Sequence, residues 1–563
     1  PAGGSAQAVF DLEPGPGPGK AVFHLEVEAG TETYRESIEL AVRPAAGTRV
    51  ETVMKVVAPG ETVRLEPPAG WLPASLAMSG TLSSLPSAQL GRALDYVVHY
   101  PYGCLEQTVS GAFPLLRAQD WIHRLLPSDR ALGDVEGLTA AAVARVLSMQ
   151  QEGGGFALWP FQRGVSDPET LYALHFLVEA QAAGFPVPET HLKAGLDWLR
   201  NRLEKAVSPD LEEKDWRIEM GRRAYACQIL ALAGHPDAGW AARLAEQSGR
   251  LDYAARVHTA AALLHAGEPR QAVALMEALP MPAPRARVPG RLLDSEVRDA
   301  ALLLSAWLEI DPDHAAVPAL AQRLRDLQRD GHWGNTQDNA LALLAFGKLA
   351  RRLPDEEQPL SGSVRLPDGT VREFAATNDV SWSTAPGGGG GVEIRNDGPG
   401  KAYLCVRYEG VPAEPEPASS QGVAIRREWL DLNGNPIEPD AVRQGDLLVA
   451  RLTVDPQGNR LDQLVIEDLL PAGLEIENAN LATAQLVPWL EKKKKGEGDR
   501  HREARDDRML IFTGPIPGEE TAFHYAVRAV TPGTFVLPPP TVAGMYEPEF
   551  RGAGEGGELV VRP

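Results

Sequence analysis

The chain has 563 residues, of which 44% are hydrophobic and 23% are charged, a composition typical of folded globular protein and not of disordered chains. At roughly 150 residues per domain, this length predicts about four folded units. Lys and Arg number 55 against 76 Asp and Glu, so the formal net charge is −21, the wrong sign for neutralising phosphates. We therefore expect no nucleic-acid partner, and no apolar run is long enough to predict membrane contact.

The first 80 residues predict two β segments. Residues 21–28 alternate apolar and polar side chains, and residues 34–42 repeat the pattern after a Gly turn. Two strands are too few for a sandwich, so we interpret residues 1–45 as the last strands of one. A second β stretch covers residues 46–80. Because the chain starts without Met, we expect that it is part of a longer protein with any targeting signal upstream.

Residues 81–352 predict an all-helical domain. They are rich in Ala and Leu with a period of 3.6 residues, interrupted by Gly and Pro. An internal repeat at spacings of about 30 to 40 residues is typical of stacked helix pairs. The similar segments are residues 223–234, 257–267, 298–304 and 337–344.

Beyond the helical region, the β pattern returns in two parts. Residues 353–412 carry strand-like segments around a Gly-rich run, and residues 413–563 contain several short strands separated by turn residues. The second part predicts an antiparallel sandwich. The charged run 491–508 is mixed in sign, and we expect a mobile solvated loop there.

Three cysteines, odd in number and far apart, exclude a disulfide framework. Cys227 and Cys405 lie within apolar helical and strand patterns, where we expect buried structural thiols. Cys104 differs, because Gly103 precedes it and a helix-compatible stretch follows. This places Cys104 in or near a first helical turn, where the helix dipole favours a thiolate.

Gln107 follows Cys104 by three residues, a spacing that brings two side chains to one face of a helix. A thiolate beside a carboxamide can displace ammonia and leave an intramolecular thioester. Such a bond survives only under a dry cover, for which Tyr100, Tyr102 and Phe113 are the local candidates. The simpler interpretation of these two residues alone is an ordinary buried thiol at a helix start.

The segment Tyr-Pro-Tyr-Gly-Cys-Leu-Glu-Gln-Thr at residues 100–108 resembles the thioester motif of the alpha-macroglobulin and complement family, Gly-Cys-x-Glu-Gln. Further segments resemble bacterial alpha-2-macroglobulins, so that the resemblance covers nearly the whole chain: residues 167–177, 336–342, 530–540 and 545–546. It implies a Cys104–Gln107 thioester, with Gly103, Leu105 and Glu106 as the other motif residues.

The same resemblance implies a multidomain α and β architecture. An α/α toroid thioester domain (81–352) is inserted in a CUB-type β domain (46–80 and 353–412). A macroglobulin-type antiparallel sandwich (413–563) follows, and residues 1–45 resemble the end of a preceding sandwich of the same type. The family shields its thioester where the helical domain meets the last sandwich, which makes Tyr100, Tyr102, Met545 and Tyr546 the candidate shield.

The function that the resemblance implies is broad-spectrum inhibition of endopeptidases and not enzymatic turnover. A protease cuts a bait region upstream, the shield opens, and a protease Lys attacks the Gln107 carbonyl while Cys104 becomes a free thiol. The expected partners are attacking proteases and the upstream domains, and no cofactor or metal is expected. The expected location is the periplasm or cell envelope, with an inner-membrane anchor upstream as one arrangement.

Two alternatives from other classes stay open. Cys104 could be the nucleophile of an acyl-transfer enzyme with His99 as its base. The chain could also be a carbohydrate-active α/α toroid with β modules, which requires acidic residues clustered at the mouth of the toroid. We expect His99, His175 and His258 to be structural, and no zinc-ligand spacing or phosphate-binding glycine loop is present.

Overall fold

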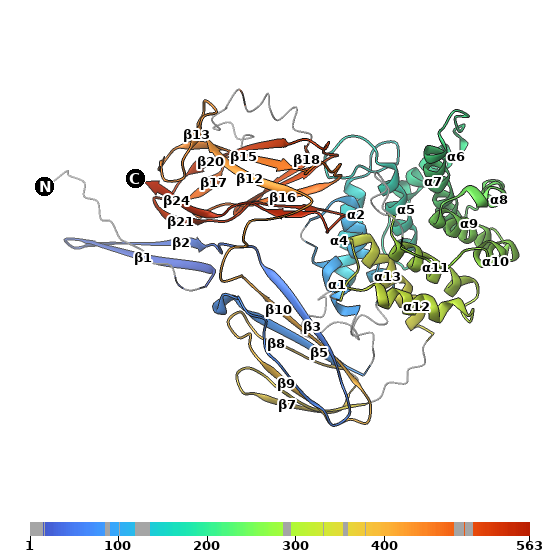
Figure 1. The fold of residues 1–563 in the computed structure, drawn as a ribbon, viewed down its shortest axis with the longest axis horizontal. Helices are drawn as coiled ribbons and strands as arrows, with labels where there is room; N and C mark the ends of the chain where they lie inside the picture. Colours follow the sequence, from blue (N-terminus) through green and yellow to red (C-terminus); the bar gives the residue numbers. More distant parts are fainter. Residues whose placement is uncertain are drawn as a thin grey trace.

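The computed structural model describes residues 15, 17–84, 90–100, 102–118, 135–284, 294–329, 331–352, 359–377, 379–477, 489 and 499–563. It shows a hairpin, a β domain, a helical domain and a C-terminal sandwich (Figure 1). Within these ranges, no helix combines the length and apolarity needed to cross a bilayer.

The N-terminal hairpin contains the two strands predicted from alternation. β1 (Gly19–Ala29) pairs antiparallel with β2 (Glu32–Val42), and the two form a sheet of their own. The pair Val27 and Tyr34 lies on one face, and these side chains are 46% and 60% exposed. One face of the hairpin is therefore apolar and exposed to solvent. An isolated two-stranded sheet is at best marginally stable in water.

The β domain is made from two segments that lie on either side of the helical domain in sequence. Its two four-stranded sheets have the orders β3-β10-β5-β8 and β4-β9-β6-β7. Their side chains share one apolar core that includes Trp382 and Tyr408. The strands are β3 (Arg49–Val57), β4 (Thr62–Leu65), β5 (Ala77–Ser83), β6 (Leu360–Arg365), β7 (Val371–Thr377), β8 (Asp379–Ser383), β9 (Val392–Asn396) and β10 (Ala402–Gly410).

The predicted start of helical structure at residue 81 is wrong by several residues. β5 continues to Ser83 because both of its edges are paired, one with β10 and one with β8. Its last six residues are buried, and the first α-helix in the described part of the chain begins at Gly91.

The helical domain contains the predicted repeated helices. The repeated segments fall in α7, α9, α11 and α13, which pack in sequence order. Together with α2 and α5 they form a closed ring, because α13 contacts α2 and α2 contacts α5. The helices are α1 (Gly91–Val98), α2 (Leu105–Ala112), α3 (Leu115–Ala118), α4 (Val135–Ser148), α5 (Asp167–Ala182), α6 (Glu189–Glu204), α7 (Glu213–Leu232), α8 (Ala238–Glu246), α9 (Tyr253–His265), α10 (Pro269–Glu277), α11 (Glu296–Ile310), α12 (Ala316–Leu327) and α13 (Thr336–Ala350).

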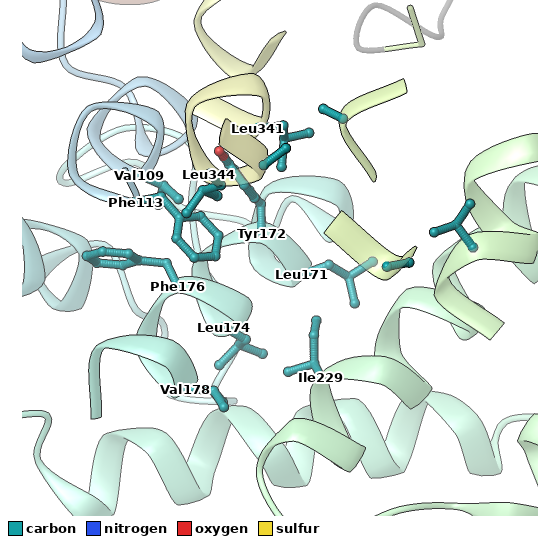
Figure 2. Packing of buried hydrophobic residues seen from close by; sticks show 14 of the residues in the cluster. Val109, Phe113, Leu171, Tyr172, Leu174, Phe176, Val178, Ile229, Leu341 and Leu344 are labelled. Carbon is teal, nitrogen blue, oxygen red and sulfur yellow. The ribbon is translucent and has the colours of Figure 1, made fainter. Parts of the chain in front are cut away.

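Helix α2 is held in the middle of this domain's core. Figure 2 shows Val109 and Phe113 at its C-terminal end close to Tyr172 and Phe176 of α5 and Leu344 of α13. All five are buried, so α2 has little freedom to move as a unit. The N-terminal end of α2, which carries the Cys104 motif, is therefore fixed by a rigid scaffold.

The C-terminal sandwich consists mainly of a six-stranded and a five-stranded sheet packed around one core. The buried pair Arg427 and Asp468 joins them, and Tyr525 also donates to Asp468 (2.6 Å). The strands are β11 (Ser419–Gln421), β12 (Ala424–Leu430), β13 (Pro436–Ile437), β14 (Val442–Arg443), β15 (Leu447–Asp455), β16 (Leu464–Leu469), β17 (Leu474–Ile476), β18 (Asp499–Ala504), β19 (Arg508–Thr513), β20 (Thr521–Ala529), β21 (Gly533–Leu537), β22 (Thr541–Gly544), β23 (Arg551–Ala553) and β24 (Gly557–Arg562).

The predicted loop at 491–508 is wrong for its second half. β18 pairs antiparallel with β19, and His501 stacks on an aromatic ring of the helical domain. Backbone pairing and this ring contact outweigh the charges of the run. Residues 490–498 lie outside the described part of the chain.

Candidate functional site

Cys104 is the N-cap of α2 and forms a reciprocal capping box with Gln107. The Cys104 backbone N–H donates to Gln107 Oε1 (3.2 Å), and the Gln107 N–H donates to Cys104 Sγ (3.5 Å). In this arrangement an N-cap side chain and the third helical residue satisfy each other's unpaired backbone donors. The predicted closeness of Cys104 and Gln107 is therefore a direct result of how the helix begins.

The Cys104 thiol is fully buried, and its burial raises its pKa well above the ordinary value. The negative charge of nearby Glu106 raises the pKa further, while the hydrogen bonds that Sγ shares with the Gln107 N–H and the Tyr546 hydroxyl act in the opposite direction. The prediction that the helix start favours a Cys104 thiolate is thus wrong for the buried site, because the loss of solvation outweighs the effect of the helix dipole. The neutral thiol needs a proton acceptor before it can react.

Neighbouring motif residues fix the backbone around Cys104. The Leu105 N–H donates to the Leu158 carbonyl (2.8 Å), and Leu105 itself is fully buried. The Gly103 carbonyl accepts from Arg145 Nη2 of α4 (2.7 Å). A Cβ at position 103 would lie 2.6 Å from this guanidinium, so a glycine permits the close approach.

Glu106 is a carboxylate buried among neutral hydrogen-bond donors. Its oxygens accept from Thr336 of α13 (2.8 and 3.0 Å) and from Ser110 (2.6 Å). Burial raises the Glu106 pKa to about 7, and hydrogen bonds from Ser110, Thr336 and Tyr546 oppose that rise. These contacts attach α2 to α13 and leave a group that can exchange a proton near neutral pH.

An apolar cluster between the helical domain and the C-terminal sandwich covers Cys104. Met545 and Tyr546 belong to it, each 4% exposed, and the Tyr546 hydroxyl lies 3.7 Å from Cys104 Sγ. The other fully buried members are Trp159, Val465, Leu510 and Phe512. The cover is therefore built from both domains.

Tyr100 and Tyr102 extend this cover along the helical domain. Their rings meet edge to face at 5.5 Å, and Tyr102 meets Phe512 of the sandwich in the same way at 5.4 Å. Phe113, predicted as a third local member, instead packs against His175 and Phe176 in the helical core. Phe113 lies about one and two-thirds turns past Gln107, so its side chain points to a different face of the helix from the Cys104–Gln107 pair.

Trp159 and Phe512, two further members of the cover, belong to no sequence motif that marks their role. The ring of Trp159, in the loop after α4, packs against Phe512 with the ring centroids 4.4 Å apart. It also stacks on His501, with the centroids 4.5 Å apart. These partners are more than 300 residues away in the chain, so only tertiary structure brings them together. An aromatic residue in a Gly-rich loop is the one hint that sequence offered.

The three candidate histidines lie away from the thiol. His99 Nδ1 contacts Asp95 (3.0 Å), a side chain that also pairs with Arg407 of β10. His175 contacts the Tyr225 hydroxyl (2.8 Å), and His258 Nδ1 contacts Gln228 (2.6 Å) within the helical ring. In the described ranges, no group of three or more His, Cys, Asp or Glu could hold a metal ion.

The site is thus a cysteine–glutamine pair at a helix start, sealed between a helical domain and a β-sandwich of a multidomain chain. The family model described as Bacterial Alpha-2-macroglobulin MG10 domain matches residues 422–549. Alpha-2-macroglobulin of Escherichia coli strain K12 is 30% identical, over 93% of this chain and 32% of that protein. Over most of its length the chain is homologous to bacterial alpha-2-macroglobulins.

Solved structures agree with this assignment. A crystal structure of native E. coli alpha-2-macroglobulin from domain MG7 to the C-terminus has the same fold, with a TM-score of 0.77, 24% identity and coverage of 97% of this chain and 88% of that one. Salmonella alpha-2-macroglobulin reacted with methylamine gives a TM-score of 0.79 at 27% identity, over 97% of this chain and 36% of that one. The chain spans about a third of the length of the curated relatives it matches.

Proposed function

We propose that this chain is the thioester-bearing part of a broad-spectrum protease inhibitor, which binds proteases covalently through a Cys104–Gln107 thioester. The observation that carries the proposal is the capping box, which places the thiol and the carboxamide on the same helical turn beneath an apolar cover from two domains. Such a bond stores an activated acyl group within the protein, so the molecule reacts once and does not turn over.

Opening of the pocket would release the reactivity. Cys104 is covered by Met545 and Tyr546 of the sandwich and by Tyr100 and Tyr102 of the helical domain, so separation of the two domains admits water and amines. We propose that cleavage of a bait region upstream causes this separation. A protease Lys then attacks the Gln107 carbonyl, an amide link forms, and Cys104 leaves as a thiol.

The family relationship supports an assignment for each part of the chain. We assign the helical ring to an α/α toroid thioester domain and the split β domain to a CUB type. Residues 413–563 correspond to the last macroglobulin-type sandwich, and residues 1–45 to the end of the preceding one, whose remaining strands would cover the apolar face of the hairpin. We propose the periplasm or cell envelope as its location.

Neither alternative gains support from the geometry. His99, the base of the enzyme hypothesis, is 61% exposed and contacts Asp95, whereas Cys104 is fully buried. The carbohydrate-active hypothesis requires acidic residues gathered at the mouth of the helical ring. The buried Glu106 does not meet that requirement, because it lies inside the core and bonds to Thr336 and Ser110.

Methylamine, a small amine that reaches buried thioesters, tests the proposal. We expect it to add to Gln107 and to release one new thiol per chain, at Cys104, located by peptide mass spectrometry. Cys104→Ala should show neither change, and Cys227→Ala, which removes a thiol buried in α7, should react like wild type. Absence of both the adduct and the new thiol in the wild-type chain would overturn the thioester.

A further inference from the structure

The groups around Cys104 are suited to forming the thioester as well as to shielding it. We propose that Tyr546 and Glu106 act as a proton relay through which the Cys104 thiol acylates itself on Gln107. This inference rests on the proposed function, since the relay has no task without a thioester. It gives Tyr546, a residue of the sandwich, a catalytic part in a reaction between two residues at the start of α2.

The carboxamide carbonyl is already activated by its own helix. Gln107 Oε1 accepts from the Cys104 backbone N–H (3.2 Å), and negative charge grows on this oxygen when sulfur adds to the carbonyl carbon. A backbone donor at a helix N-terminus stabilises such charge, and burial strengthens the effect. Sγ lies 3.5 Å from the Gln107 backbone nitrogen, on the same turn.

The side-chain amide nitrogen of Gln107 is in an unfavourable environment, unlike the carbonyl oxygen of the same carboxamide. Nε2 is buried and has no hydrogen-bond partner among the residues that the structure describes, whereas the carbonyl oxygen has one. Leaving a buried polar group unpaired costs roughly 1–3 kcal/mol. Departure of this nitrogen as ammonia removes the unpaired group, which offsets part of the free energy needed to convert the carboxamide to the thioester.

The thiol proton has a path to a base. The Tyr546 hydroxyl lies 3.7 Å from Cys104 Sγ, and it also hydrogen-bonds to the Glu106 carboxylate. Burial keeps the Tyr546 pKa well above its ordinary value, so the phenol passes a proton on and does not store negative charge. Thr336 and Ser110 hold the Glu106 carboxylate in place for this exchange.

The step balances without an outside reagent. The thiol proton moves to the Tyr546 oxygen while the Tyr546 proton moves to Glu106. Sγ bonds to the Gln107 carbonyl carbon, the bond from that carbon to Nε2 breaks, and the relay returns the proton to the departing nitrogen. Ammonia leaves, Tyr546 and Glu106 end as they began, and nothing is oxidised or reduced.

Glu106 must be ionised to accept the proton, so closure of the thioester should speed up as pH rises through about 7, its raised pKa. The titratable groups that act on Glu106 from α1, α2, α5 and the sandwich are Tyr96, Tyr100, Cys104, Glu169, Tyr172 and Tyr546. The phenols and the thiol have raised pKa values and remain neutral near pH 7. Glu169 adds negative charge that raises the Glu106 pKa.

Reclosure after opening with ammonium chloride tests the relay, because ammonia regenerates Gln107 and the Cys104 thiol. After the ammonium is removed, closure is followed as loss of one thiol and of one ammonia by intact mass. We expect Tyr546→Phe, which keeps the ring, to close about 100-fold more slowly, as for loss of a general acid–base group. Tyr525→Phe, which removes another buried hydroxyl bonded to a carboxylate, should close at the wild-type rate.

Glu106→Gln is the second variant. It tests the relay independently if Tyr546→Phe does not fold. We expect slow closure in this variant and no acceleration through pH 7. Wild-type closure rates in Tyr546→Phe, or a wild-type pH profile in Glu106→Gln, would overturn the relay while the thioester stands. A wild-type chain that never loses ammonia would overturn the thioester and the relay together.

Discussion

Cys104 and Gln107 come together through the geometry of one helix start, and this part of the site could be predicted from their spacing. The protonation state could not, because it depends on a cover supplied by residues distant in sequence. Burial beneath Tyr546 raises the thiol pKa, whereas the sequence alone shows only the favourable helix terminus. The part of the site that sequence reveals least is therefore its solvent exclusion.

Trp159 is the residue whose loss should open the cover most. Truncation of a buried Trp costs about 3–5 kcal/mol, and 1.4 kcal/mol of lost interface stability already raises an open population tenfold. We expect Trp159→Ala to react with methylamine at least about tenfold faster, measured as thiol release. Phe161→Ala, in the same loop but fully exposed, should react at the wild-type rate. Equal rates in the two variants would remove Trp159 from the shield.

At the scale of elements, repetition and alternation predicted most of the fold. The four repeated segments are α7, α9, α11 and α13, because each must bury an apolar face against the next. The strand β18 was missed because its sequence is charged, and its place depends on pairing with β19. The local pattern of apolar and polar residues thus predicts elements that carry their own apolar face. It fails for an element such as β18, whose place depends on pairing with a neighbouring strand.

The two sheets of the C-terminal sandwich are joined by Arg427 of β12 and Asp468 of β16, whose side chains are 2% and 0% exposed. Arg427→Met leaves Asp468 buried without its cation, and breaking such a pair costs about 3–5 kcal/mol. We expect a correspondingly lower urea midpoint for this domain. Arg426→Met breaks the neighbouring exposed pair with Glu520, which should lower the midpoint much less, because water screens that pair. Equal shifts for the two variants would contradict this role of the buried pair.

At the scale of the whole molecule, the site exists only where two domains meet. The helical domain supplies the reactive pair, and the sandwich supplies Met545, Tyr546 and Phe512 above it. The proposed thioester would be controlled by the position of the two domains, since no local change in α2 is needed to expose it. This division explains why residues 104–107 lie at a helix start that faces another domain.

Intact mass of the untreated wild-type chain is the most direct test of the central claim. The account predicts that the wild-type mass is lower than the mass calculated from its sequence by one ammonia. Cys104→Ala cannot form the bond, so its measured mass should equal the mass calculated from its own sequence. Cys227→Ala should retain the deficit, because its thiol lies in the helical core and not beside Gln107. A wild-type mass equal to that of the sequence, with a free thiol at Cys104, would contradict the account.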